Sequence, residues 1–314
     1  MSSVPAITPG VPAKEEVRET HRPRPITCRR SEELASGCPR FYFSGSTHVY
    51  AVISSRARGL SVGVNLNPDQ HCNFDCVYCE VDRRALARLS GPAPVNAHAV
   101  ATELSHALAL VKAGSLLKHA YFSGLPEEMV RLAHVAISGD GEPTLCPNFA
   151  EAVEGIVHLR AAGLAPYFKV VLVTNATALD RDGVRAGLRL FTRADEVWAK
   201  LDAGTQEGMD RINRGSVPLE KVLQNILEVG RQRPVVVQSL FVELDGLLPD
   251  RAELCAYAER LNALKTGGAN IPLVQIYSAT RPHHSRRCRH LSLRVLSEIA
   301  TLVHQITGLR VEVF

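Results

Sequence analysis

Three cysteines within eight residues form the part of this sequence with the clearest chemistry. Cys72, Cys76 and Cys79 stand in the order Cys-Asn-Phe-Asp-Cys-Val-Tyr-Cys, directly after a strand-like segment at 61–66 and a turn at 67–69. Thiolates are the usual protein ligands of iron–sulfur clusters, and a cubane of four irons needs four ligands. The CxxxCxxC spacing therefore predicts a metal centre in which one iron takes its ligand from elsewhere.

A zinc ion is the alternative occupant of these thiols. His71 stands next to Cys72 and would supply a fourth ligand. Structural zinc sites, however, favour two well-separated ligand pairs of the CxxC type, which this stretch lacks. We therefore favour the cluster, with a non-enzymatic iron–sulfur redox protein and a zinc-binding interaction protein as the alternatives.

The same stretch resembles the CxxxCxΦC signature of radical S-adenosylmethionine (SAM) enzymes, because the aromatic Tyr78 precedes the third cysteine. The resemblance implies that Cys72, Cys76 and Cys79 hold a [4Fe–4S] cluster, that SAM chelates the fourth iron, and that Tyr78 packs near the SAM adenine. It also implies that electron transfer cleaves SAM to methionine and a 5′-deoxyadenosyl radical, which abstracts hydrogen from a substrate. A reductant such as flavodoxin or ferredoxin is then an expected partner.

Length and charge place the chain among globular proteins. Its 314 residues suffice for one α/β domain with a tail, and the formal net charge of +4 permits an anionic partner such as RNA without requiring one. No apolar run approaches the ~18 residues that span a membrane, and prolines and charges stand where a signal peptide needs an apolar stretch. We expect a cytoplasmic protein without a membrane segment, with its thiols used on metal.

The sequence predicts two segments, one poorly ordered and one folded. Residues 1–45 are predicted to form a poorly ordered tail, because five prolines between positions 5 and 25 interrupt any regular element. Residues 46–314 are predicted to form the radical SAM core with a C-terminal extension.

Short apolar runs alternate with helical patterns through the core. Candidate strands are 61–66, 133–138, 169–174, 196–201, 234–243 and 271–278, and helical periodicity falls near 99–112, 149–162, 219–227, 254–261 and 293–306. Six strands with helical crossovers predict an α/β fold with a parallel sheet. Periodicity fits an open sheet and a curved one equally, whereas the resemblance implies a (βα)6 partial TIM barrel.

A glycine-rich turn follows the second of these strands. Parallel α/β folds bind ligands at the carboxyl ends of their strands, and the run Gly139-Asp140-Gly141-Glu142 lies at such an end. The glycines allow backbone amides to approach a ligand closely. The run resembles the superfamily motif that binds the SAM amino group, with Glu142 as its side-chain participant, although an ordinary glycine-rich turn is the alternative.

Polar residues also end the later strands. Asn175 follows the third strand, and Lys200 and Asp202 alternate onto one side of the fourth, where they either form a structural ion pair or face a ligand together. The resemblance implies contacts of these three residues with the SAM carboxylate and ribose. Gln238 and Gln275 lie in the fifth and sixth strands, and buried glutamines either bind a ligand or satisfy one another.

Several further motifs resemble the radical SAM proteins related to the tRNA wyosine-base synthase. They are SGDGEPTL (138–145), VTNAT (173–177), KLDA (200–203), INRG (212–215) and ATRP (279–282). These motifs indicate the subgroup and not the substrate, for which a tRNA base is one candidate. The arginine-rich loop at 281–290 would either meet RNA phosphates or another anionic substrate, or be an ordinary solvated basic loop. Radical modification of a peptide or small metabolite is the alternative.

The wyosine enzyme holds a second cluster with three cysteines upstream of its SAM triad. Here only Cys28 and Cys38 precede Cys72, so two thiols would have to replace three. The sequence therefore predicts a second cluster only where a later cysteine completes it, and the later cysteines are Cys146, Cys255 and Cys288.

Overall fold

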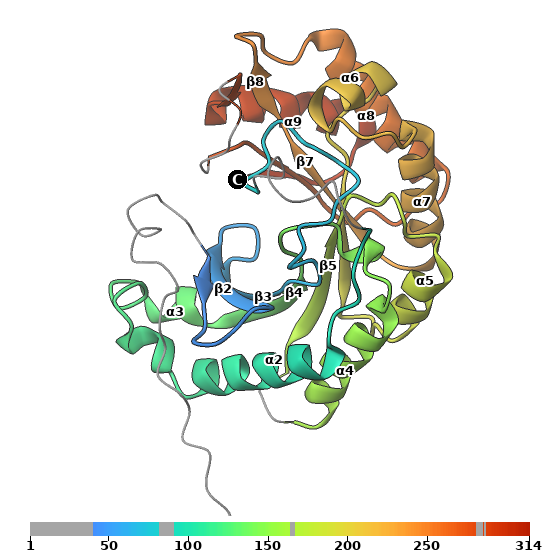
Figure 1. Cartoon of the computed structure of the whole chain (residues 1–314). Coiled ribbons are helices and arrows are strands. Elements are labelled where there is room, and N and C mark those ends of the chain that lie inside the picture. Colours follow the sequence, from blue (N-terminus) through green and yellow to red (C-terminus); the bar gives the residue numbers. More distant parts are fainter. Residues whose placement is uncertain (1–39, 82–90, 164–166, 281–284, 286) are drawn as a thin grey trace, which may run out of the picture.

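Nine strands form one curved sheet in the computed structural model, which describes residues 40–81, 91–163, 167–280, 285 and 287–314 (Figure 1). Their order in the sheet is β1-β2-β3-β4-β5-β6-β7-β9-β11. The strands are β1 (Phe41–Tyr42), β2 (Val49–Ser54), β3 (Gly59–Val64), β4 (Leu132–Ile137), β5 (Lys169–Thr174), β6 (Glu196–Lys200), β7 (Val235–Leu240), β9 (Val274–Tyr277) and β11 (Val311–Val313). Strands β8 (Val242–Leu244) and β10 (Cys288–His290) form a separate antiparallel pair.

The six predicted strands are confirmed as the parallel part of this sheet. Strands β3, β4, β5, β6, β7 and β9 pair in parallel, each with the next. Valine, isoleucine and leucine dominate these runs, as in strands that are buried on both faces. Because parallel strands need crossover connections, helices separate most of them in sequence.

Helices lie on the outer side of this arc (Figure 1). They are α2 (Ala97–Lys112), α3 (Glu127–Val130), α4 (Phe149–Ala161), α5 (Asp182–Arg189), α6 (Gln206–Ile212), α7 (Leu219–Gln232), α8 (Arg251–Thr266) and α9 (Leu293–Thr307), with 3-10 turns at Ser115–Lys118 and Pro143–Leu145. Side chains of Asn96, Asp250 and Ser292 cap α2, α8 and α9, and α9 ends at Gly308 with a φ of 65°. The predicted (βα)6 partial barrel is thereby confirmed.

Strands that the sequence did not predict extend the barrel at both ends. The antiparallel strands β1 and β2 precede β3, and β11 adds to β9 in parallel. Arg58, in the turn between β2 and β3, donates to Glu312 in β11 at 3.0 Å, so a side-chain ion pair joins this turn to the last strand of the sheet.

The folded domain begins before the boundary at residue 45 that the sequence predicts. Phe41 and Phe43 are buried in the main core, where Phe41 packs edge-to-face on Phe122. Their aromatic side chains supply apolar area that a proline-rich composition conceals.

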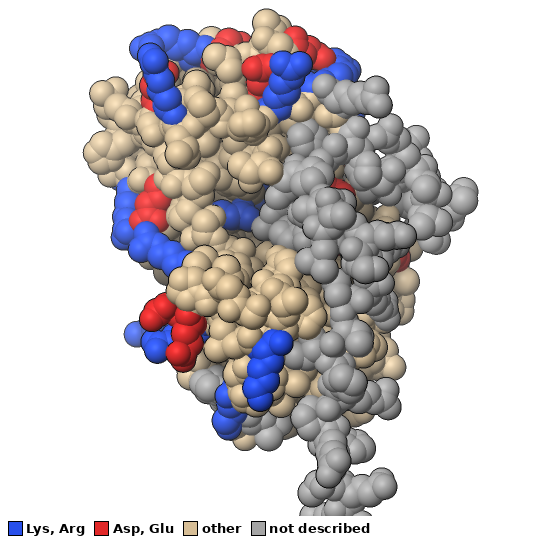
Figure 2. Space-filling model, turned by 90° about the vertical axis from the view of Figure 1, so that its left-hand side faces the viewer, with Lys and Arg blue, Asp and Glu red and all other residues tan. Residues whose placement is uncertain are grey.

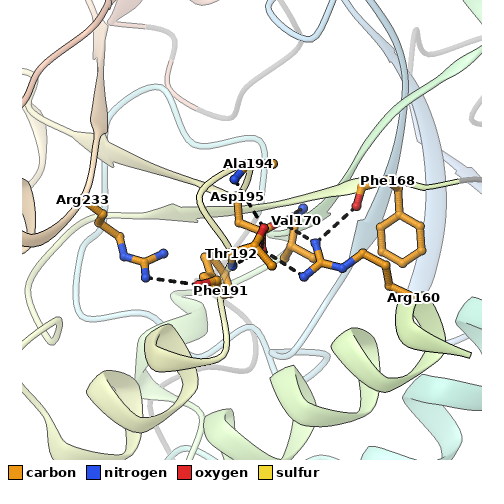
Figure 3. Close-up of polar contacts among 8 residues, drawn as sticks. All are labelled: Arg160, Phe168, Val170, Phe191, Thr192, Ala194, Asp195 and Arg233. Atoms are coloured by element: carbon orange, nitrogen blue, oxygen red, sulfur yellow. Dashed lines mark hydrogen bonds and ion pairs between the residues drawn. The ribbon is translucent and has the colours of Figure 1, made fainter.

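An ion pair fixes the amino ends of β5 and β6 (Figure 3). Arg160 of α4 donates to both carboxylate oxygens of Asp195, at 2.6 and 3.0 Å, and to the Phe168 carbonyl at 3.3 Å. Asp195 also accepts from the Val170 backbone at 2.7 Å and from Thr192. Burial raises the pKa of Asp195, but these donors outweigh it and hold the pKa below its ordinary value.

None of the helices in the described part of the chain is long and apolar enough to cross a lipid bilayer.

Candidate active site

A cavity of about 390 Å³ gathers most of the predicted site residues at the carboxyl ends of the parallel strands. Its lining includes Cys72, Cys76, Tyr78, Cys79, Gly139, Gly141, Glu142, Asn175 and Lys200. Asp140 and Asp202 are not among the lining residues. Each forms an ion pair with a residue that is, Asp140 with Arg40 and Asp202 with Lys200. Its volume lies within the ~300–1,000 Å³ range of small-molecule sites.

The cysteine loop is held by the INRG segment at 212–215. The backbone amides of Asp75 and Val77 donate to the carbonyls of Asn213 and Ile212, each at 2.9 Å. Gly215 is needed here, because a Cβ at this position would lie 2.3 Å from the Phe74 ring. The loop therefore has a defined shape although it carries no regular secondary structure.

Nitrogen donors surround the sulfur atoms of this loop. The side-chain amide of Asn213 donates to Cys76 Sγ at 3.4 Å, and the Phe74 backbone donates to Cys72 Sγ at 3.4 Å. Such donors suit thiolates that hold an iron–sulfur cluster, since hydrogen bonds to sulfur tune its potential. Burial raises the pKa of Cys76 to about 11.

The three thiols share a cavity rather than a single point. Among the described residues, no three His, Cys, Asp or Glu side chains come together as they would around one metal ion. Ligands of a zinc ion all lie ~2.0–2.3 Å from the same atom, whereas cluster ligands each reach a different iron. The choice between a cluster and zinc at Cys72, Cys76 and Cys79 stays a prediction.

The glycine-rich turn packs directly against the cysteine loop. A Cβ at Gly139 would lie 2.3 Å from the Asn65 side chain, and one at Gly141 would lie 2.1 Å from the His71 carbonyl. The Glu142 amide donates to that same carbonyl at 2.9 Å. Only glycine fits these two positions, and the turn is thereby fixed beside Cys72.

Glu142 is buried with neutral partners. Its Oε1 accepts from the Thr144 backbone at 3.1 Å and from the hydroxyls of Thr144 and Thr174 at 2.6 Å each. Its Oε2 accepts from the Asn175 amide at 2.7 Å. Burial nevertheless raises the pKa of Glu142, because it outweighs these four donors.

Asp140 is occupied by protein groups. Arg40 forms an ion pair with its Oδ1, and Asn65 donates to its Oδ2 at 2.6 Å. The side chain thus connects the turn to β1 and β3.

Lys200 and Asp202 form the ion pair that the sequence offered as one alternative, at 3.2 Å. Asp202 also accepts from the Tyr78 hydroxyl, from the Leu240 amide at 2.8 Å and from the Asn213 side chain at 2.8 Å. Burial lowers the pKa of Lys200, but Asp202 and the neighbouring tyrosine outweigh it and hold the pKa above its ordinary value. Lys200 still lines the cavity, so the pair holds a cation in place there.

Sequence reasoning missed Asn213 and Arg56 as residues of the site, and it did not foresee the partner of Tyr277. Asn213 belongs to the INRG motif, which gave the signal without its role. Arg56 lies in the turn between β2 and β3 and Tyr277 lies in β9, with the Arg56 guanidinium 4.1 Å from the centre of the Tyr277 ring. No pattern in the sequence connects these two positions.

The remaining described cysteines stand on separate elements. Cys146 follows the glycine-rich turn and donates to Asn148 at 3.4 Å, Cys255 lies in α8, and Cys288 is buried in β10. Cys28 and Cys38 lie outside the described residues. The prediction of a second cluster is therefore untested.

The arginine-rich loop is described only in part, because residues 281–284 and 286 lie outside the described residues. Arg287 pairs with Asp245, and Arg289 lies 3.8 Å from Glu243. These two described arginines therefore face carboxylates in β8 and directly after it.

Comparison with known proteins agrees with this architecture. The family model of the radical SAM superfamily matches residues 66–242. The UPF0026 protein slr1464 of Synechocystis is 30% identical over 76% of this chain and 78% of its own length. A UPF0026 protein of Helicobacter pylori is 25% identical over 62% of this chain and 56% of its own length.

Solved structures share the fold at low sequence identity. TYW1 with a lysine-pyruvate adduct bound has a TM-score of 0.56 at 14% identity, covering 89% of this chain and 90% of its own. A radical SAM methyltransferase from Sphaerobacter thermophilus has a TM-score of 0.57 at 16% identity, covering 88% and 72%. Streptococcus suis SuiB bound to S-adenosylmethionine has a TM-score of 0.53 at 11% identity, covering 82% and 52%.

This chain therefore belongs to the radical SAM superfamily and to the UPF0026 proteins. It is a radical SAM enzyme, and the cofactors of this superfamily are a [4Fe–4S] cluster and SAM.

Proposed function

We propose that this enzyme reductively cleaves SAM at a cluster bound by Cys72, Cys76 and Cys79, and modifies a substrate in the adjoining part of the cavity. The observation that supports this most is the hydrogen bond from the Glu142 amide to the His71 carbonyl. It fixes the glycine-rich turn against the cysteine loop, so that a ligand of the cluster would also reach the turn. A zinc or redox protein has no need for that junction.

Each residue would have a distinct role toward SAM. Glu142 has a buried carboxylate and no cation among its described partners, so it would accept a hydrogen bond from the SAM amino group. Gly139 and Gly141 would let the backbone of the turn come close to the ligand. Lys200 would face the SAM carboxylate. When bound, the cluster supplies the electron that splits SAM into methionine and a 5′-deoxyadenosyl radical.

The other predicted residues would act by position. Asn175 donates to Asn73 at 2.8 Å and thus keeps the cysteine loop next to the carboxyl end of β5. Asp202 would orient both Lys200 and Tyr78, whose ring would face the adenine. Asp140 would hold the turn in place.

This chemistry also sets the surroundings that the enzyme requires. Reduction of a [4Fe–4S] cluster needs an electron donor such as flavodoxin or ferredoxin, and a reducing compartment such as the cytoplasm. A tRNA base stays a prediction for the substrate, as does the alternative of a peptide or small metabolite.

The test is anaerobic reconstitution of the wild-type protein and of Cys76→Ala with iron and sulfide, followed by dithionite and SAM. We expect about four irons per chain and 5′-deoxyadenosine from the wild type, and neither from the variant. Its thermal midpoint should stay close to that of the wild-type apoprotein, because Cys76 lies on a loop. Cys255→Ala, in helix α8, is the matched control and should keep both properties.

Absence of iron uptake and of SAM cleavage in the wild type would overturn the proposal and favour zinc. About eight irons per chain would instead indicate a second cluster.

A further inference from the structure

Two residues that line the cavity each carry a buried polar atom without a partner among the described residues. These atoms are Nδ1 of His134 in β4 and Oε1 of Gln238 in β7, whose side chains are 2% and 1% exposed. Gln238 does pair with Gln275 at 2.7 Å, but this amide–amide bond leaves one polar atom of Gln238 over. Buried polar groups nearly always have a hydrogen-bond partner, so these two atoms point to a molecule that binds here.

The surface beneath them is apolar. The His134 ring packs edge-to-face on Trp198 with a centroid separation of 5.2 Å, and Trp198 belongs to a buried cluster with Val171 and Val236. The Trp198 indole already donates to Glu196 at 2.7 Å. His134 also precedes Ser138 by four residues, or ~13 Å along a strand, so it lies well below the glycine-rich turn.

Arg56 supplies a cation to this part of the cavity. Arg40 and Lys200, which also line the cavity, are paired with Asp140 and Asp202. No ion pair joins Arg56 to a carboxylate within the described ranges; its guanidinium instead stacks on Tyr277 at 4.1 Å.

Stacking leaves the N–H edge of the Arg56 guanidinium free to bind in its own plane. That edge matches the two oxygens of a carboxylate or phosphate. Arg56 also lies close enough to His134 to help lower the pKa of that ring, after burial and Lys169, to about 3. The imidazole is therefore neutral and offers a hydrogen bond without a charge.

We propose that Arg56, His134, Trp198 and Gln238 form the substrate subsite of this enzyme. The substrate is a small molecule with a carboxylate or phosphate group for Arg56 and a neutral hydrogen-bonding group for His134 or Gln238. Calling this molecule the substrate rests on the proposed function; the binding of a small anion does not.

A small molecule fits these observations better than RNA does. The subsite lies inside a cavity of about 390 Å³ that SAM would share, whereas RNA backbones are bound by exposed basic surfaces. Figure 2 shows the left-hand side of Figure 1, where several of the visible Lys and Arg groups lie beside Asp and Glu groups, while others near the centre and the lower end stand alone. The described arginines Arg287 and Arg289 likewise face carboxylates.

The test measures binding of lactate, glycerol 3-phosphate and a tRNA anticodon stem-loop to the anaerobic, cluster-loaded protein by calorimetry, with and without SAM. We expect lactate or glycerol 3-phosphate to bind, and the one that binds identifies the anion. Arg56→Gln should weaken that binding at least tenfold and Gln238→Leu at least threefold, while Arg56→Lys should retain part of it. Arg58→Gln is the matched control, because Arg58 lies in the same turn but pairs with Glu312 and should leave binding unchanged.

The outcomes separate this proposal from the proposed function when 5′-deoxyadenosine is measured on the same samples. Binding that depends on Arg56 in a protein that fails to cleave SAM would sink the enzymatic proposal and keep the anion site. SAM cleavage without small-anion binding, or with binding that Arg56→Gln leaves intact, would overturn the subsite. Binding of the stem-loop alone would overturn it in favour of RNA, and loss of binding in Arg58→Gln would assign the effect to the turn's shape.

Discussion

Glu142 and Asp195 are both buried carboxylates, placed at opposite ends of the same parallel strands, and the protein treats them differently. Asp195, at the amino ends, accepts two hydrogen bonds from the Arg160 guanidinium, and its pKa is held below the ordinary value. Glu142, at the carboxyl ends, accepts hydrogen bonds only from neutral described groups such as Thr174 and Asn175, and burial raises its pKa.

The difference shows at which end of the barrel the protein itself supplies a cation for a buried carboxylate. A buried anion is costly unless a cation or several donors compensate it. At Asp195 the chain supplies the cation and thereby fixes two strands to helix α4. At Glu142 the carboxylate lines a cavity, so its countercharge has room to come from a ligand.

The strongest way to break the comparison is to remove the amino-end carboxylate. Asp195→Ala leaves the buried Arg160 without its partner, and we expect the free energy of unfolding to fall by about 3–5 kcal/mol. Urea denaturation of the apoprotein measures this. Glu228→Ala removes the exposed ion pair with Arg185 and should cost less than about 1 kcal/mol. Equal losses in the two variants would contradict a special role for Asp195.

Removing the charge at the carboxyl end should instead affect SAM. Glu142→Gln keeps the shape of the side chain but loses the anion for the SAM amino group, and we expect the Kd for SAM to rise at least about tenfold, or about 1.4 kcal/mol. Equilibrium dialysis with the anaerobic, reconstituted protein measures this. Asp195→Asn serves as the control and should change the Kd by less than about twofold, since it lies at the other end of the strands. Unchanged affinity in Glu142→Gln would remove this carboxylate from the SAM site.

The smallest expected effect is a difference in the sign of pH dependence. Because the folded pKa of Asp195 is lowered, its stabilisation is complete above the ordinary value of 3.8 and is lost as the pH falls through the folded value. The folded pKa of Glu142 is raised, so its penalty is complete above that raised value and disappears as the pH falls to 4.5.

Unfolding free energies of the wild type, Asp195→Asn and Glu142→Gln between about pH 3 and pH 7 test these signs. As the pH falls, the unfolding free energy of the wild type should lose its excess over that of Asp195→Asn. Over the same range it should rise relative to that of Glu142→Gln. Parallel curves would show that the two carboxylates have the same environment.

Much of the fold could be predicted because its strands are continuous apolar runs. Strands β3, β4, β5, β6, β7 and β9 fall within three residues of their predicted bounds, as expected where both faces of a strand are buried. Strand β2 was missed although its sequence VYAVIS is an apolar run, because residues 46–60 were interpreted as a lead-in to β3. Strand β11 was missed because three residues carry too little periodicity. Phe41 and Phe43 were assigned to the tail because the composition nearby conceals two core aromatics.

The site could be predicted where its chemistry is local in sequence. The cysteine spacing and the glycine-rich turn each lie within a few residues, and the structure places both on one cavity. Asp140 shows the limit of such reasoning, since its carboxylate is occupied by Arg40, 100 residues away. Asn213, which donates to Cys76 Sγ across 137 residues, shows the same limit from the other side.

The sequence by itself determined the local features: three closely spaced thiols, a glycine-rich turn at the end of a strand, and apolar runs that form strands. Residue type and short spacing suffice for these, because they depend on covalent geometry and on burial of neighbouring side chains. The tertiary structure decided which charged and polar groups have a partner within the described residues and which do not. Curvature of the sheet brings Arg56 over Tyr277 and leaves His134 and Gln238 facing a cavity, and such contacts between distant segments exist only once the chain has folded.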